Sequence, residues 1–178
     1  MLKFVAVAVA VASMSTMVLA EGLPIGESVQ AFYVKDVTGP SAGKKLCYRC
    51  RYGNDPVVSI FTRKVDGHVS DLIAGVDGVV GKNQSKDMKA FVVVLTDQPE
   101  AQEAELKKVA ASKGITNTPL TTFDGPAGPA NYQIAENAEV TVMMWVGGKL
   151  KVNEALSASD LTAEKINNVL GKTNSILN

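Results

Sequence analysis

The chain contains two cysteines, Cys47 and Cys50, with two residues between them. A Cys-x-x-Cys pair can close a small disulfide ring and exchange it with another dithiol, so we expect any covalent chemistry of this chain here. Basic residues stand at four positions around the pair: Lys44, Lys45, Arg49 and Arg51. Nearby cations favour the reactive thiolate over the thiol. Cys47 and Cys50 are therefore the candidate redox pair, and Lys45, Arg49 and Arg51 are the candidates for lowering the thiol pKa.

The same pair can also be read as a permanent disulfide. In an ideal strand, residues three apart point to opposite faces, so a Cys47–Cys50 bridge within a strand needs a turn or a bulge. A ring of this size also adds less stability than a long one. Two functions stay open: thiol–disulfide exchange or redox sensing, and a non-catalytic binding or structural module in which Cys47–Cys50 is a structural disulfide.

Other chemistries lack the residues they need. Structural zinc takes four ligands, whereas the chain adds one histidine, His68, to its two cysteines. Two thiolates alone would suit only a soft ion such as Cu(I). Arg51 stands where covalent haem attachment requires histidine. No phosphate-binding loop, Ser-His-Asp arrangement or paired-carboxylate motif is recognisable, so the sequence predicts no metal and no cofactor. We expect His68 to be solvated on a helix.

The first twenty residues have the composition of a secretory signal peptide. Lys3 supplies the positive start, an apolar run begins at Phe4, and small residues precede Glu21. We expect cleavage after Ala20 and a secreted or periplasmic protein, with retention as a membrane anchor as the less favoured alternative. Disulfides persist in such compartments.

The remaining residues, 21–178, have the size of one domain. No later segment is long and apolar enough to span a bilayer. The whole chain carries 18 basic and 18 acidic residues. This balance argues against a nucleic-acid partner, because nucleic-acid binders normally carry a clustered positive surface. The partner that the cysteines suggest is a protein thiol or disulfide.

Hydrophobic patterning predicts an N-terminal β-hairpin followed by alternating strands and helices. The hairpin comprises strands at 29–37 and 44–51, with the cysteines on or near the second, joined by a turn at 38–43. The other predicted strands lie at 57–61, 91–95, 120–123, 140–146 and 149–155. Helices are predicted at 65–80, ending near Gly81, at 97–113, beginning with Asp97 as cap and ending before Gly114, and after the capping residue Thr162. Trp145, Met143 and Met144 are expected in the core, and residues 124–129 in a loop.

This order of elements resembles the thioredoxin-like superfamily over residues 29–172, and the extra hairpin resembles its peroxiredoxin-like and secreted thiol-oxidoreductase branches. The resemblance implies an α/β fold: a mixed sheet flanked by helices, with an N-terminal β-hairpin carrying the Cys-x-x-Cys. In that family the active cysteines follow the first core strand, where this chain has Thr62–His68 without cysteine. The family's cis-proline precedes the third core strand, where Ala138–Thr141 contains no proline. The resemblance therefore assigns no catalytic residue to either position.

Overall fold

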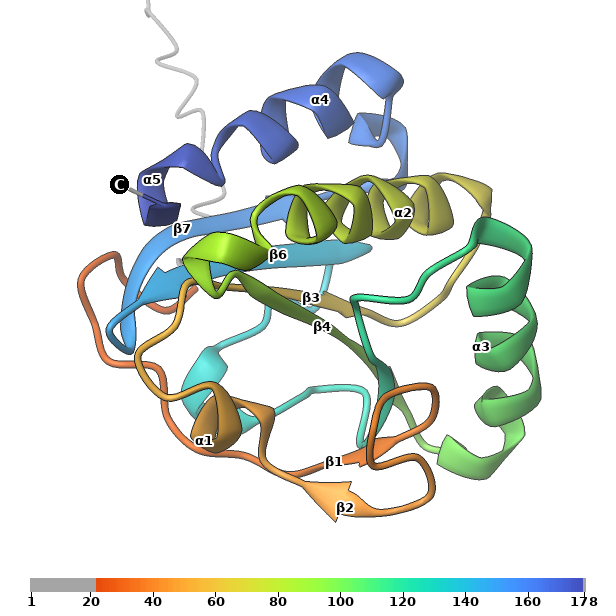
Figure 1. Ribbon diagram of the computed structural model, residues 1–178. Helices are drawn as coiled ribbons and strands as arrows, with labels where there is room; N and C mark the ends of the chain where they lie inside the picture. Colours follow the sequence, from red (N-terminus) through yellow and green to blue (C-terminus); the bar gives the residue numbers. More distant parts are fainter. Residues whose placement is uncertain (1–21, 178) are drawn as a thin grey trace, which may run out of the picture.

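A computed structural model describes residues 22–177 of the chain. A seven-stranded mixed sheet runs through its centre in the order β2-β1-β5-β4-β3-β6-β7. Helices cover both faces of this sheet (Figure 1). The predicted α/β architecture is confirmed. The predicted signal peptide and its cleavage after Ala20 lie outside the described residues.

The strands are β1 Val34–Asp36, β2 Lys45–Leu46, β3 Val57–Thr62, β4 Lys89–Thr96, β5 Leu120–Asp124, β6 Val140–Val146 and β7 Lys149–Leu156. The α-helices are α1 Tyr48–Tyr52, α2 Gly67–Lys82, α3 Pro99–Lys113, α4 Ala163–Gly171 and α5 Asn174–Leu177. Short 3₁₀ turns lie at Gln84–Lys86, Ala130–Tyr132 and Ala158–Asp160.

The central strands form where the sequence has long β-branched and aromatic runs. β3 and β4 pair in parallel, with Ile60 opposite Val92, and β4 pairs in parallel with β5. β6 runs antiparallel to β3 and places Val142 opposite Ile60. Strands buried on both faces need apolar side chains on both, which explains runs without a polar alternation.

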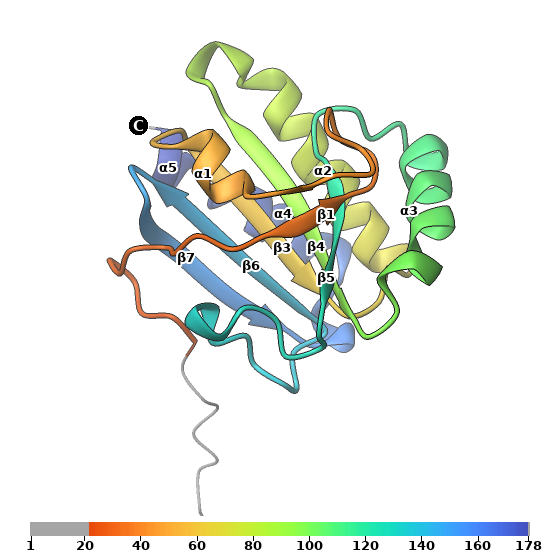
Figure 2. The same ribbon diagram turned by 90° about the horizontal axis from the view of Figure 1, so that it is seen from below.

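The two faces of the sheet have different cores. Aliphatic side chains of α2, α3 and α4 cover one face, with Leu72, Leu106 and Val169 buried there. The other face is aromatic and includes Phe91 and Trp145. Figure 2 shows α1 and the extended N-terminal segment crossing this second face. Trp145, Met143 and Met144 are fully buried, which confirms their predicted place in the core.

The capping residues predict some of the helix ends correctly and others not. Thr162 caps α4 by accepting the Lys165 N–H, and Gly114 ends α3 in the left-handed conformation, both as predicted. Asp97 is not the cap of α3, because Pro99 takes the first helical position and places Gln98 at the cap. α2 also continues through Gly81 and ends at Lys82.

The predicted hairpin is present, but both of its strands are shorter than predicted. β1 covers only Val34–Asp36, and β2 covers only Lys45–Leu46. Residues 48–51, predicted as the end of the second strand, lie in the helix α1. No helix within residues 22–177 combines the length and the apolar composition needed to cross a membrane.

Glu154 on β7 gives the fold a pH dependence. Burial raises the pKa of its carboxyl, but hydrogen bonds from Lys165 and Lys172 outweigh burial and hold that pKa below 4.5. A lowered folded-state pKa adds stability above the unfolded value, and this stability is lost as the pH falls through the folded value. We expect Glu154→Gln to lower the free energy of unfolding by roughly 1–2 kcal/mol at pH 7.

The difference between wild type and Glu154→Gln should shrink below pH 4.5, as urea titrations across pH would show. Glu105→Gln is the matched control, since Glu105 forms an exposed pair with Lys108 on α3. A stability difference for Glu154→Gln that stays constant down to pH 2 would contradict this account of the ion pairs.

Candidate functional site

Cys47 and Cys50 form a disulfide across the first turn of α1, with 5.2 Å between their Cα atoms. Cys47 is the N-cap of the helix, and Cys50 is its third residue. Residues three apart lie on the same face of a helix, one turn apart. The helix therefore supplies the turn that a bridge at this spacing requires and that a continuous strand lacks.

α1 forms because its side chains bury one face and because a glycine ends it. Tyr48 and Tyr52, one turn apart, pack with 5.1 Å between their ring centroids, and Tyr48 stacks on Phe91 of β4 at 5.4 Å. Gly53 ends the helix with φ 55°, a conformation that suits glycine. The i,i+4 tyrosines followed by glycine are the sequence signal that would have predicted this helix.

Tyr48 is also held by a buried carboxylate. Its hydroxyl donates to Asp36 of β1 at 2.9 Å, and both residues are essentially inaccessible to solvent. Asp36 also accepts the backbone N–H groups of Gly39 at 2.7 Å and Ser41 at 2.8 Å. Burial, followed by the hydrogen bond to Asp36, raises the pKa of Tyr48, so the phenol keeps the proton that it donates.

Gly39 permits this close arrangement. A Cβ atom at this position would lie 2.7 Å from both carboxylate oxygens of Asp36 and would also overlap the Tyr48 hydroxyl. The turn chemistry at 38–43 was predicted, but the role of Asp36 was not. An aspartate followed by a turn that contains glycine and serine is the sequence pattern that indicates such a role, because the aspartate side chain can accept backbone N–H groups of the turn.

Arg49, the other residue between the cysteines, is anchored as well. Its guanidinium donates to the carbonyl oxygens of Val29 and Gly53, each at 3.1 Å. Its terminal nitrogen lies so close to Gly148 in the β6–β7 turn that a side chain there would collide with it. Tyr48 thus attaches α1 to β1 and β4, and Arg49 attaches it to the segment at Val29 and packs against the β6–β7 turn.

The two cysteines differ in exposure. Cys47 is only 7% exposed, whereas Cys50 is exposed to solvent. The Cys50 backbone N–H donates to the Cys47 sulfur at 3.0 Å. This bond would stabilise negative charge on that sulfur if the disulfide opened.

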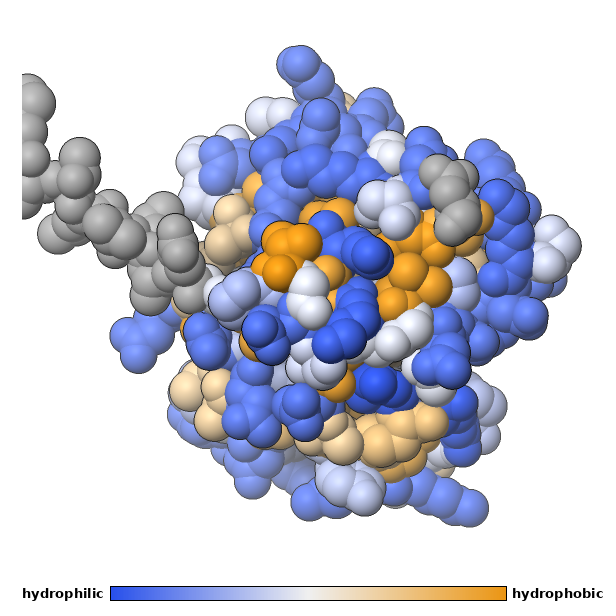
Figure 3. Space-filling view, turned by 90° about the vertical axis from the view of Figure 1, so that its left-hand side faces the viewer, coloured by the Kyte–Doolittle hydropathy of each residue, from blue (hydrophilic) through white to orange (hydrophobic). Residues whose placement is uncertain are grey.

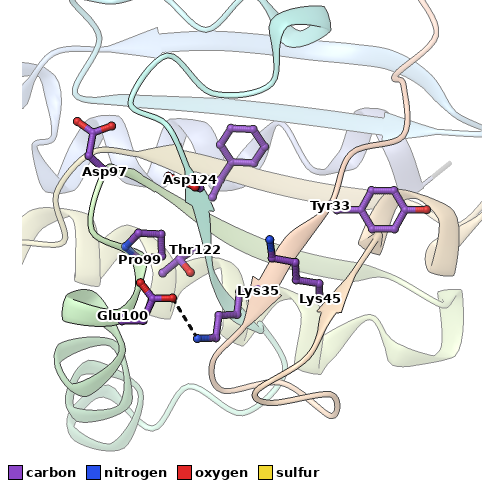
Figure 4. Close-up of a pocket in the computed structure, with 9 residues that line it drawn as sticks. Tyr33, Lys35, Lys45, Asp97, Pro99, Glu100, Thr122 and Asp124 are labelled. Atoms are coloured by element: carbon purple, nitrogen blue, oxygen red, sulfur yellow. Dashed lines mark ion pairs between the residues drawn. The ribbon is translucent and has the colours of Figure 1, made fainter.

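The three candidate pKa-lowering cations point in different directions. Arg51 is exposed and lies over the Tyr48 ring, 5.9 Å from its centroid. Arg49 is bound to backbone carbonyls. Lys45 lines a cavity of about 340 Å³ beside β1 and β5. Lys35 and Glu100, which pair at 3.6 Å, line the same cavity (Figure 4). Arg49 and Arg51 both adjoin Cys50 in the chain, but only Arg51 is exposed and, within the described residues, not bound to backbone carbonyls.

His68 and the acidic side chains do not gather around the cysteine pair in the part of the chain that the structure describes. His68 is exposed on the first turn of α2, as expected for a solvated histidine. Within residues 22–177, no three side chains of His, Cys, Asp or Glu gather as a metal site would require. On the side of the molecule shown in Figure 3, apolar side chains form separate groups between polar ones.

Comparison with known proteins gives structural similarity and no sequence match. No family model and no curated protein matches the chain. Solved structures do match, among them a candidate protein disulfide isomerase from Bacteroides thetaiotaomicron, with a TM-score of 0.66 at 18% identity over 87% of this chain and 91% of that one. The chain has a thioredoxin-like fold.

Two further thioredoxin-like structures support this assignment. A candidate thiol:disulfide interchange protein, DsbE, from Chlorobium tepidum matches with a TM-score of 0.58 at 16% identity, over 84% of this chain and 99% of that one. The mitochondrial 2-Cys peroxiredoxin of Plasmodium falciparum matches with a TM-score of 0.61 at 13% identity, over 86% and 94%. At these identities the similarity concerns the fold.

Arg63 occupies the junction at which thioredoxin-like enzymes carry their cysteines. Its guanidinium donates to the carbonyl oxygens of Pro126, Ala135 and Ala138, at 3.0, 3.2 and 2.8 Å. These bonds tie the chain just after β3 to the loop at 124–129 and to the segment before β6. No cis peptide bond occurs within residues 22–177. In this chain the junction between β3 and α2 is thus held by an arginine that binds backbone carbonyl groups.

We expect Arg63→Met to lower the free energy of unfolding by about 2–3 kcal/mol, because the carbonyl groups lose a charged donor. Lys64→Met is the matched control, since Lys64 is exposed beside it. The rate at which a small thiol reduces the Cys47–Cys50 disulfide should stay within about twofold of wild type in both variants. Equal stabilities of the two variants would show that the Arg63 bonds do not hold these loops.

Proposed function

We propose that the chain is an exported thiol–disulfide exchange protein in which Cys50 is the sulfur that partners attack and Cys47 is the leaving and resolving sulfur. The unequal exposure of the pair carries this proposal, since Cys47 is 7% exposed and Cys50 is open to solvent. Access to a sulfur is one of the factors that set the rate of exchange.

The exchange has two balanced steps. A partner thiolate attacks the Cys50 sulfur, the Cys47–Cys50 bond breaks, and its electron pair leaves on Cys47 as a thiolate. A second partner thiolate then attacks the partner's own sulfur in the mixed disulfide and releases Cys50 as a thiolate. The partner is oxidised to a disulfide and the chain is reduced to a dithiol. In the reverse direction Cys50 attacks and Cys47 resolves.

Two groups support the departure of Cys47. The Cys50 N–H, 3.0 Å from the Cys47 sulfur, can stabilise the thiolate that forms there. Arg51 adds positive charge to the same short helix, and positive charge lowers a thiol pKa. In this proposal Lys45 and Arg49 add positive charge near the pair. Lys45 itself lines the cavity beside β1 and β5, and Arg49 donates to the Val29 carbonyl. The partner is a protein that carries a thiol or a disulfide.

Export fits this chemistry. The N-terminal sequence of the chain has the features of a signal peptide, and a disulfide persists in a secreted or periplasmic protein. The small size of the disulfide ring also supports exchange. A disulfide that closes a short loop constrains the unfolded chain only slightly, so stabilisation alone explains this one poorly.

Single-cysteine variants test the roles of the two sulfurs. Cys47→Ser leaves the exposed Cys50 and should form a mixed disulfide with glutathione disulfide at least tenfold faster than Cys50→Ser, which leaves the buried Cys47. The rates can be followed by acid quenching, alkylation and intact mass measurement. Equal rates, or a faster reaction of Cys50→Ser, would reverse the assignment.

The wild-type protein tests exchange itself. We expect a reducing thioredoxin system to open the disulfide while circular dichroism shows the fold unchanged. If the disulfide resists reduction in the folded protein, the exchange function is wrong and the disulfide is structural.

A further inference from the structure

The residue inside the disulfide ring has the strongest anchor at the site. Tyr48 directly follows Cys47 and lies within the ring that Cys50 closes. Tyr48 is 1% exposed, its ring stacks on Phe91, and its hydroxyl donates to Asp36. The ring and the hydroxyl of Tyr48 thereby each anchor the backbone segment between the two cysteines.

Asp36 is the rigid end of this connection. It lies on β1, twelve residues before Tyr48, and has no exposed surface. Its carboxylate also accepts two backbone N–H groups of the turn that follows β1, from Gly39 and Ser41. A buried carboxylate held by three donors has little freedom to move.

We propose that Asp36 is a positioning residue for the Cys47–Cys50 pair and acts through the hydroxyl of Tyr48. This inference rests on the proposed exchange function. After reduction, the only covalent link between the two cysteines is the backbone through Tyr48 and Arg49. The anchored Tyr48 keeps the two Cα atoms near their disulfide spacing of 5.2 Å.

Preorganisation of this kind changes a measurable equilibrium. In a glutathione buffer, the protein dithiol gives two electrons to glutathione disulfide: the Cys47–Cys50 bond forms, the glutathione disulfide bond breaks, and two glutathione thiols are released. The equilibrium constant is proportional to the effective concentration that one protein thiol has with respect to the other. Holding two reacting groups in place raises that concentration. The Asp36–Tyr48 bond therefore favours the protein disulfide.

The test uses Tyr48→Phe, with Tyr132→Phe as the matched control. Tyr48→Phe keeps the stacked ring and removes the hydroxyl that reaches Asp36. Tyr132 is also fully buried, and its hydroxyl donates to the Gln30 carbonyl at 2.7 Å. Both variants lose one hydroxyl hydrogen bond, but only Tyr48 lies within the disulfide ring.

Equilibrium constants are measured in glutathione buffers by acid quenching, alkylation and mass measurement. We expect Tyr48→Phe to lower the constant about tenfold, which corresponds to a midpoint potential about 30 mV higher. Tyr132→Phe, which loses a hydrogen bond to a neutral carbonyl, should also lower the melting temperature but leave the constant within about twofold of wild type.

Asp36→Asn and the double variant test whether Asp36 acts through Tyr48. If it does, Asp36→Asn also lowers the constant, and adding Tyr48→Phe to it causes no further tenfold loss, because coupled residues are not additive. If Asp36→Asn does not fold, Tyr48→Phe still decides the matter.

The failures can be told apart. A wild-type pair that reacts reversibly, together with an unchanged constant in Tyr48→Phe, overturns the role of Asp36 and leaves the exchange function intact. Equal shifts in Tyr48→Phe and Tyr132→Phe also overturn it, since loss of stability would then explain both. A wild-type disulfide that does not equilibrate with glutathione overturns the exchange function and this inference together.

Discussion

The site depends on how the protein satisfies one buried negative charge. Moving a carboxylate out of water is costly unless donors replace its hydration. Asp36 obtains three donors, two from the turn after β1 and one from Tyr48 on α1. Each hydrogen bond to a charged group contributes roughly 1.5–3 kcal/mol to stability. Removing any one of the three donors from Asp36 therefore lowers the free energy of unfolding. A strand, a turn and a helix are thereby joined at one point.

The core of the fold follows from local patterns. Continuous apolar runs made β3, β4 and β6 predictable, and Thr162 and Gly114 marked true helix ends. The same reasoning failed at residues 48–51, which it predicts as strand although they lie in the helix Tyr48–Tyr52, in part because aromatic residues favour a strand by propensity. A helix forms there instead of a strand because Tyr48 and Tyr52 bury one helical face against Phe91 and because Gly53 ends the helix. Tertiary packing decided a segment that propensity alone could not.

Residue type and spacing identified the cysteine pair, but not its surroundings. Nothing local distinguishes the exposure of Cys47 from that of Cys50, because exposure depends on what packs over α1. The sequence places the basic residues in one group around the cysteines, whereas in the structure Lys45 lines a separate cavity. The contacts of Arg63 reach 63 to 75 residues along the chain, so no local pattern reveals them.

The cysteine pair and Arg63 lie at opposite ends of β3, since α1 precedes this strand and Arg63 follows it. A strand of six residues is about 20 Å long. A single partner thiol could not reach both ends without moving between them. The two ends of this strand are therefore separate positions for chemistry within one fold. A thioredoxin-like chain with cysteines at both would carry two sites that are oxidised and reduced independently.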